Sequence, residues 1–160
     1  MKFKHLVEIN DPLNPLIDTL THDQLWQGLV LRAEMPTLFI PWMDRCEVLE
    51  RDPGSMLRET HFGELVVRDR VTFIPQRQVC YHVPQQGDIP MSMLTMTIEE
   101  PQPGILYVRF EYDDGKEDTE EGVDAFYDDF RRSAYEEADI DTIRMIRQLA
   151  AEGRLDGPLM

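Results

Sequence analysis

The sequence predicts a single α+β domain, covering residues 1–160, in which seven antiparallel strands form a curved sheet around a long C-terminal helix. Three observations predict this fold class. The first residues alternate between apolar and polar, turn residues divide the middle of the chain into strand-length segments, and no Pro or Gly occurs from Asp124 to Glu152. A chain of this length can bury one substantial core without disulfides or metals, so one domain is expected.

A strand is expected at Phe3–Ile9, because its apolar side chains recur at every second position. A helix is expected at His22–Glu34. Thr21 and Gln24 form a capping-box pattern, and apolar residues follow at helical spacing. A proline then interrupts this helix, and the apolar stretch from Thr37 to Pro41 predicts a second, short helical segment. Two short helices therefore separate the first strand from the second.

The middle of the chain predicts six more strands. They are Cys46–Arg51, Met56–Phe62, Leu65–Phe73, Gln78–Val83, Met91–Glu99 and Ile105–Tyr112. Short segments rich in Pro, Gly, Asp and Gln separate them, and such segments are typical of turns. Because the connections are short and consecutive, an antiparallel meander is expected.

The last element is expected to be one helix from about Asp124 to Gly153. Its apolar residues recur at four-residue steps from Phe126 through Phe130, which predicts that this face lies against the sheet. A helix of this length extends about 45 Å, so it must cross several strands. The acidic segment before it, Asp113–Asp124, is interpreted as helix initiation on a solvated loop rather than a calcium site, because the spacing of an EF-hand loop is missing.

Composition excludes several function classes. The formal net charge of −15 repels polyanions and anionic membranes, so neither nucleic acid nor a stable membrane association is expected. The sequence begins without the apolar core of a signal peptide and has no apolar run long enough to span a bilayer, so a cytoplasmic protein is expected. Cys46 and Cys80 form no CxxC pair and are interpreted as reduced structural residues.

Common catalytic motifs are missing from the sequence. It contains no HExxH, GxSxG, GxGxxG or Walker loop. Its four histidines, His5, His22, His61 and His82, show no ligand spacing, so neither a metal site nor a cofactor is expected.

Several stretches resemble one known family. They are residues 3–11 (FKHLVEIND), 25–34 (LWQGLVLRAE), 67–71 (VRDRV), 94–100 (LTMTIEE) and 125–142 (AFYDDFRRSAYEEADIDT). These stretches resemble the AtaL-like branch of the SRPBCC superfamily, which also includes START lipid-transfer domains, plant pathogenesis-related allergens and polyketide aromatase/cyclases. The resemblance implies the helix-grip fold and a deep cavity between the sheet and the long helix. It leaves the activity open, because one fold serves many functions.

Strand and helix periodicity predicts which side chains face that cavity. The expected ligand-contacting residues are His5, Val67, Asp69, Val71, Tyr81, Met96, Phe110, Tyr112, Phe126 and Phe130. Of these, the two tyrosines combine an apolar ring with one directional hydrogen bond, which suits recognition of a largely apolar molecule.

Two polar residues on apolar strand faces leave alternatives open. Asp69 is interpreted as a partner of an arginine, a polar anchor for a ligand, or a general base. His5 is either a hydrogen-bonded core residue or a catalyst, and together the two side chains could form an oriented base if they were in contact. The sequence thus predicts a non-catalytic binder of a small apolar molecule, with a cofactor-free cyclase-like enzyme as the alternative. A homodimer is a further possibility.

Overall fold

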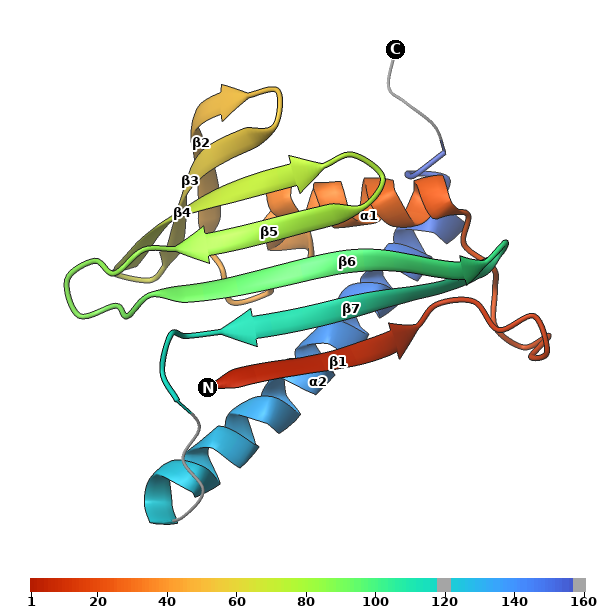
Figure 1. Cartoon of the computed structure of the whole chain (residues 1–160). Helices are drawn as coiled ribbons and strands as arrows, with labels where there is room; N and C mark the ends of the chain where they lie inside the picture. Colours follow the sequence, from red (N-terminus) through yellow and green to blue (C-terminus); the bar gives the residue numbers. More distant parts are fainter. Residues whose placement is uncertain (118–121, 157–160) are drawn as a thin grey trace.

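The computed structural model describes residues 1–117 and 122–156 and confirms the predicted fold class. A seven-stranded sheet lies against two helices, and the longer helix crosses it diagonally (Figure 1). The elements in chain order are β1 (Lys2–Glu8), α1 (His22–Glu34), the 3₁₀ turn η1 (Pro36–Leu38), β2 (Arg45–Asp52), β3 (Ser55–Phe62), β4 (Leu65–Ile74), β5 (Gln78–Val83), β6 (Ser92–Gln102), β7 (Ile105–Asp113) and α2 (Gly122–Ala151). Within the predicted acidic connection, Asp118, Glu120 and Glu121 lie outside the described residues.

The sheet is antiparallel throughout, in the order β1-β7-β6-β5-β4-β3-β2. Strands β2 to β7 follow the chain as a meander, because short turns can join only neighbouring antiparallel strands. Strand β1 pairs with the last strand, β7, so that His5 lies opposite Phe110. The sheet therefore ends at β1 on one side and at β2 on the other.

Helix α1 begins where the capping-box pattern predicts. The backbone N–H of Gln24 donates to Thr21 Oγ1 at 3.0 Å, and the Gln24 side chain accepts from the Thr21 N–H at 2.9 Å. These reciprocal bonds satisfy two backbone donors that the first turn leaves unpaired. Pro36 follows the helix end and starts η1, which turns the chain towards β2.

Helix α2 packs through its C-terminal half. Ile143, Ile146 and Leu149 are buried in the same core as Leu25 and Leu29 of α1. The helices approach closely at Gly28, where an added Cβ would lie 2.6 Å from Ile146 Cγ2. Helix α1 thus supports α2 at this end, and the core fills the space between the helices and the sheet.

The predicted inward face of the N-terminal half of α2 is wrong. Phe126 and Phe130 are 69% and 67% exposed, whereas Asp139 is almost fully buried. At about 100° per residue, the nine positions from Phe130 to Asp139 place these side chains on opposite sides of the helix. The buried face continues the spacing of Ile146 back through Asp139 to Tyr135. Hydrogen bonds to the sheet satisfy Asp139, and the Tyr135 ring stacks on Tyr112 of β7.

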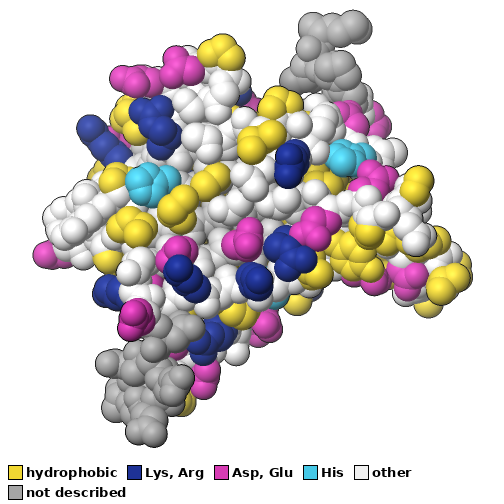
Figure 2. Space-filling model, viewed as in Figure 1, with side chains coloured by type: hydrophobic (Ala, Val, Ile, Leu, Met, Phe, Trp, Pro, Cys, Tyr) yellow, Lys and Arg dark blue, Asp and Glu magenta, His cyan; other side chains and the backbone are white. Residues whose placement is uncertain are grey.

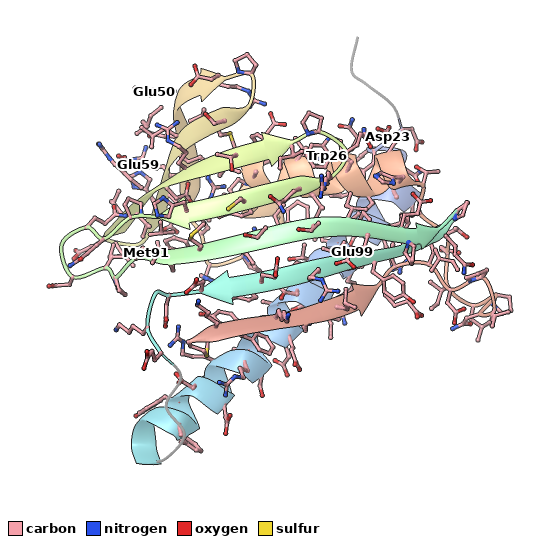
Figure 3. The ribbon with its side chains drawn as sticks, viewed as in Figure 1. Asp23, Trp26, Glu50, Glu59, Met91 and Glu99 are labelled. Atoms are coloured by element: carbon pink, nitrogen blue, oxygen red, sulfur yellow. The ribbon has the colours of Figure 1, made fainter. Side chains whose placement is uncertain are left out.

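The face of the sheet that carries no helix bears charged side chains among hydrophobic ones. Basic and acidic side chains are interspersed on it (Figure 2). Arg109 and Glu99, on neighbouring strands, form one of the ion pairs there, and Glu99 is labelled in Figure 3. The helices cover the other face, and the buried core lies between them and the sheet.

Candidate ligand site

A cavity of about 260 Å³ lies between the sheet, α1, the segment after η1, and the N-terminal half of α2. Its walls are mainly apolar, with contributions from Ile40, Phe62, Val67, Val83 and Leu94. The cavity exists because the core side chains of α2 begin only at Ile143, while the preceding turns of the helix carry polar residues towards the sheet. Its volume is at the small end of the range for ligand pockets.

A buried ion pair forms one side of the cavity. Arg58 and Asp69 are opposite each other on β3 and β4, and the guanidinium donates to both carboxylate oxygens at 2.8 and 2.6 Å. A third donor of Arg58 reaches the backbone carbonyl of Ala33 at 2.8 Å. Burial would lower the pKa of Arg58, but the hydrogen bond and charge of Asp69 outweigh it, so the pKa is raised. Asp69 therefore has an arginine partner, as one of its three interpretations predicts.

Tyr81 lies between two arginines in the cavity wall. The Cζ atoms of Arg32 and Arg58 each lie 5.1 Å from the centroid of its ring, which is the geometry of a cation–π contact. The ring lines the cavity, and the residue is only 6% exposed. Within residues 1–117 and 122–156, its hydroxyl is the buried side-chain polar atom without a hydrogen-bond partner.

A second polar group lies between α2 and the edge of the sheet. Asp139 Oδ1 accepts from the Tyr112 hydroxyl at 2.6 Å, and Asp139 Oδ2 is 2.6 Å from His5 Nε2. Burial raises the pKa of Asp139 despite these two hydrogen bonds. Burial, together with the neighbouring Asp139 charge, also raises the pKa of Tyr112. The Tyr112 ring stacks on Tyr135 with centroids 3.9 Å apart, and both rings line the cavity.

The hypothesis of a catalytic pair formed by His5 and Asp69 is wrong. Strands β7, β6 and β5 separate β1, which carries His5, from β4, which carries Asp69. Each side chain has another partner, namely Asp139 for His5 and Arg58 for Asp69. Strand alternation correctly predicted that both side chains lie on the inner face of the sheet. That face is several strands wide, so two residues on it can lie far apart.

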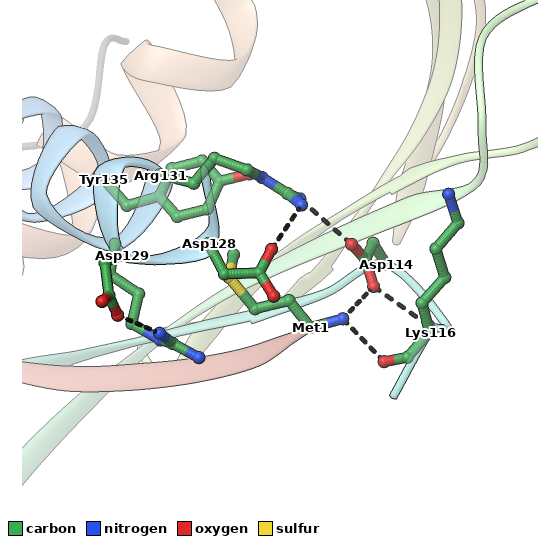
Figure 4. Close-up of polar contacts among 8 residues, drawn as sticks. Met1, Asp114, Lys116, Asp128, Asp129, Arg131 and Tyr135 are labelled. Atoms are coloured by element: carbon green, nitrogen blue, oxygen red, sulfur yellow. Dashed lines mark hydrogen bonds and ion pairs between the residues drawn. The ribbon is translucent and has the colours of Figure 1, made fainter. Parts of the chain in front are cut away.

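An ion-pair network at the end of β7 forms part of the cavity wall (Figure 4). Arg131 donates to Asp114 at 3.1 Å and pairs with Asp128 at 3.5 Å. Asp114 also accepts from the amino group of Met1 and from the backbone N–H of Lys116. Burial would raise the pKa of Asp114, but these donors outweigh it and lower the pKa to about 2. The network ties β1, β7 and α2 together.

The predicted ligand-contacting residues fall into three groups. Val67, Asp69, Tyr81 and Tyr112 line the cavity. His5, Val71, Met96 and Phe110 face inwards but pack in the core or beside the cavity, so they do not line it. Phe126 and Phe130 point away from it.

The sequence interpretation missed Arg32, Arg58, Tyr135 and Asp139 as site residues. For the last two a signal was present, because extending the apolar spacing of Ile146 towards the start of the helix reaches both.

One histidine lies close to two acidic residues. His61, Glu59 and Glu47 have ligand-type atoms within 4.8 Å of one another on β2 and β3 (Figure 3 labels Glu59). The two glutamates already pair with arginines: Glu59 with Arg68 at 3.1 Å and Glu47 with Arg45 at 2.7 Å. This group is therefore a cross-strand ion-pair network, in which the arginines offset the repulsion of facing glutamates.

Comparison with known families identifies the chain. Residues 7–153 match the family described as acetylaranotin biosynthesis cluster protein L, AtaL. The chain belongs to the AtaL family. The predicted resemblance is thus confirmed over nearly the whole length of this AtaL-family protein. No curated protein matches its sequence significantly.

Solved structures share the helix-grip fold of this AtaL-family chain at low sequence identity. The di-domain aromatase/cyclase StfQ of the steffimycin pathway superposes with a TM-score of 0.70 at 12% identity, covering 94% of this chain and 51% of StfQ. ZhuI aromatase/cyclase from Streptomyces sp. R1128 gives 0.62 at 14% identity, covering 99% of both chains. Human STARD10 gives 0.62 at 10% identity, covering 94% of this chain and 64% of STARD10.

These likenesses establish the fold alone, and this chain spans only about half the length of StfQ. Across the part of the chain that the structure describes, neither helix has the length and apolar character needed to cross a membrane.

Proposed function

We propose that this protein binds a small, largely apolar molecule of lipid-, polyketide- or aromatic-like character in the cavity between the sheet and α2. The observation that carries the proposal is the cavity itself: about 260 Å³ remains between the sheet and the helices, with mainly apolar walls, where α2 turns polar residues inwards. Burial of apolar ligand surface would supply most of the affinity, and the few polar groups would fix the orientation.

Two further points support the proposal. Tyr112 and Tyr135 offer a stacked aromatic wall to a flat ligand. The structural neighbours include two aromatase/cyclases and human STARD10. The same architecture thus occurs in proteins named for small-molecule chemistry, which supports the proposal. No nucleic acid, stable membrane association or cofactor enters the proposal, and a cytoplasmic location and a homodimer stay predictions.

The test compares two neighbouring valines on β4. Val67 lines the cavity, whereas Val66 points to the outside and is 40% exposed. We expect Val67→Phe to weaken binding of a lipophilic fluorescent dye at least about tenfold, because the larger side chain occupies the ligand space. Val66→Phe should leave dye binding unchanged. Equal dye affinity in the wild type and both variants would contradict the cavity as the binding site, and so would no dye binding at all.

A second candidate is acid–base catalysis on a polyketide-like or aromatic substrate without a cofactor. It is favoured by the hydrogen-bonded group Tyr112–Asp139–His5, whose tyrosine reaches the cavity wall. This group replaces the predicted pair of His5 and Asp69. Conversion of a bound ligand into a product, followed by mass spectrometry, distinguishes this candidate from simple binding.

A further inference from the structure

The charges that line the cavity are not equally neutralised. Three arginines contribute to its walls, namely Arg32, Arg58 and Arg131. Arg58 has both carboxylate oxygens of Asp69, and Arg131 pairs with Asp114. Arg32 forms no ion pair within the described ranges 1–117 and 122–156. Its side chain donates one long hydrogen bond there, of 3.4 Å from Nε to Thr142 Oγ1.

Asp139 does not satisfy Arg32. The charge of Arg32 is close enough to Asp139 to favour ionisation of that carboxyl group. Both Asp139 oxygens, however, already have partners, with Tyr112 on one and His5 on the other. The guanidinium of Arg32 therefore offers several unused N–H donors at the cavity wall.

Tyr81, in the same cavity wall, carries a second unused donor. Its ring lies under the guanidinium of Arg32, at 5.1 Å, and its hydroxyl is buried without a partner among the described residues. Leaving a buried hydroxyl unpaired is costly, so such a group in a cavity wall is a candidate for ligand contact. The guanidinium groups of Arg32 and Arg58 both lie on the Tyr81 ring, and only that of Arg58 is neutralised by a carboxylate. The remaining positive charge favours an anionic group nearby.

We propose that Arg32 and Tyr81 form an anion-binding end of the cavity, so that the ligand is an aromatic molecule with a carboxylate or an equally acidic oxygen group. The inference rests on the proposed function and names its ligand class. The planar guanidinium fork fits two carboxylate oxygens, and the phenol can donate to one of them. The aromatic part of the ligand would lie against Tyr112, Tyr135 and the apolar wall.

The experiment uses two probes of equal shape, 2-naphthoate and 2-naphthamide, which differ in charge. Isothermal titration calorimetry at neutral pH should show that the wild type binds the naphthoate at least about tenfold more tightly than the amide. Arg32→Met should remove this preference, so that the naphthoate binds no more tightly than the amide. Arg77→Met, which changes an exposed arginine of the β4–β5 turn, should keep it.

Tyr81→Phe gives a readout that a merely structural role would not produce. Removing an unpaired hydroxyl should leave the melting temperature of the free protein unchanged or higher. Naphthoate affinity should nevertheless fall about three- to tenfold, the effect of one lost hydrogen bond.

The possible failures are distinguishable. Equal affinity of the wild type for both probes, or an unchanged preference in Arg32→Met, overturns the anion-binding end while the apolar cavity stands. Binding of neither probe, together with no dye binding, overturns both proposals. Arg32→Lys retains the positive charge. It therefore tests whether the preference lost in Arg32→Met depends on the charge or is due to misfolding. A stable Arg32→Lys variant without any preference for the naphthoate also contradicts the inference.

Discussion

Single polar residues inside this protein are satisfied by partners from distant parts of the chain. Asp69 is paired with Arg58 on the neighbouring strand, whereas His5 reaches Asp139, which is 134 positions away. Removing one member of the Arg58–Asp69 pair would leave a buried charge, which is more costly than the pair is stabilising. The polar groups therefore constrain the position of the elements that carry them.

Asp114 provides a prediction at this scale. Its pKa in the folded protein is about 2, below the ordinary value of 3.8, so folding favours its ionised form. The resulting stability is present above the unfolded pKa and is lost as the pH falls through about 2. Asp114→Asn should therefore lower the free energy of unfolding by about 1 to 2 kcal/mol at pH 6.

The difference should shrink towards pH 2, measured by urea unfolding at several pH values. Asp88→Asn in an exposed loop should have little effect at any pH. A difference between wild type and Asp114→Asn that stays constant down to pH 2 would show that the stabilisation does not come from the ionised carboxylate.

At the scale of elements, the two ends of α2 have different roles. The turns from Ile143 onwards pack on α1 with apolar side chains, and the middle of the helix presents Tyr135 and Asp139 to the sheet. The close contact between the helices depends on Gly28, since Ile146 fills the space that a side chain would need. The cavity lies on the N-terminal side of this contact along α2. The packing of α1 against α2 therefore sets the distance between α2 and the sheet at the cavity.

Gly28→Ala should destabilise the protein by about 1 to 3 kcal/mol, although alanine favours helices, because the methyl group overlaps the fully buried Ile146. Thermal unfolding followed by circular dichroism measures the effect. In the Ile146→Ala background the same change should be neutral or stabilising. Gly54→Ala is the control, since an added Cβ there meets nothing within 4 Å. Equal costs in both backgrounds would contradict the contact.

The molecule as a whole carries a net charge of −15, with basic and acidic side chains mixed on the outer face of the sheet (Figure 2). Repulsion among the excess acidic groups opposes the compact state. Salt screens this repulsion over about 10 Å at 0.1 M and affects the buried Arg58–Asp69 pair much less.

The melting temperature should therefore rise by about 2 to 4 °C between 0.02 and 0.3 M NaCl, which corresponds to about 1 kcal/mol. Differential scanning calorimetry provides the measurement, and sodium sulfate at equal ionic strength checks for ion-specific effects. A fall in melting temperature would instead mean that surface ion pairs such as Arg109–Glu99 outweigh the repulsion.

The sequence by itself determined the elements, their order and the fold class. Strand alternation and the capping box are local patterns, so they predicted the bounds of α1 and the inward faces of the strands. Only the tertiary structure decided which face of α2 meets the sheet and that His5 pairs with Asp139 rather than Asp69. A helix with Phe130 on one side and Asp139 on the other offers two faces, and the hydrogen bonds available on the sheet select between them. Such choices depend on residues far apart in the chain, which local spacing does not encode.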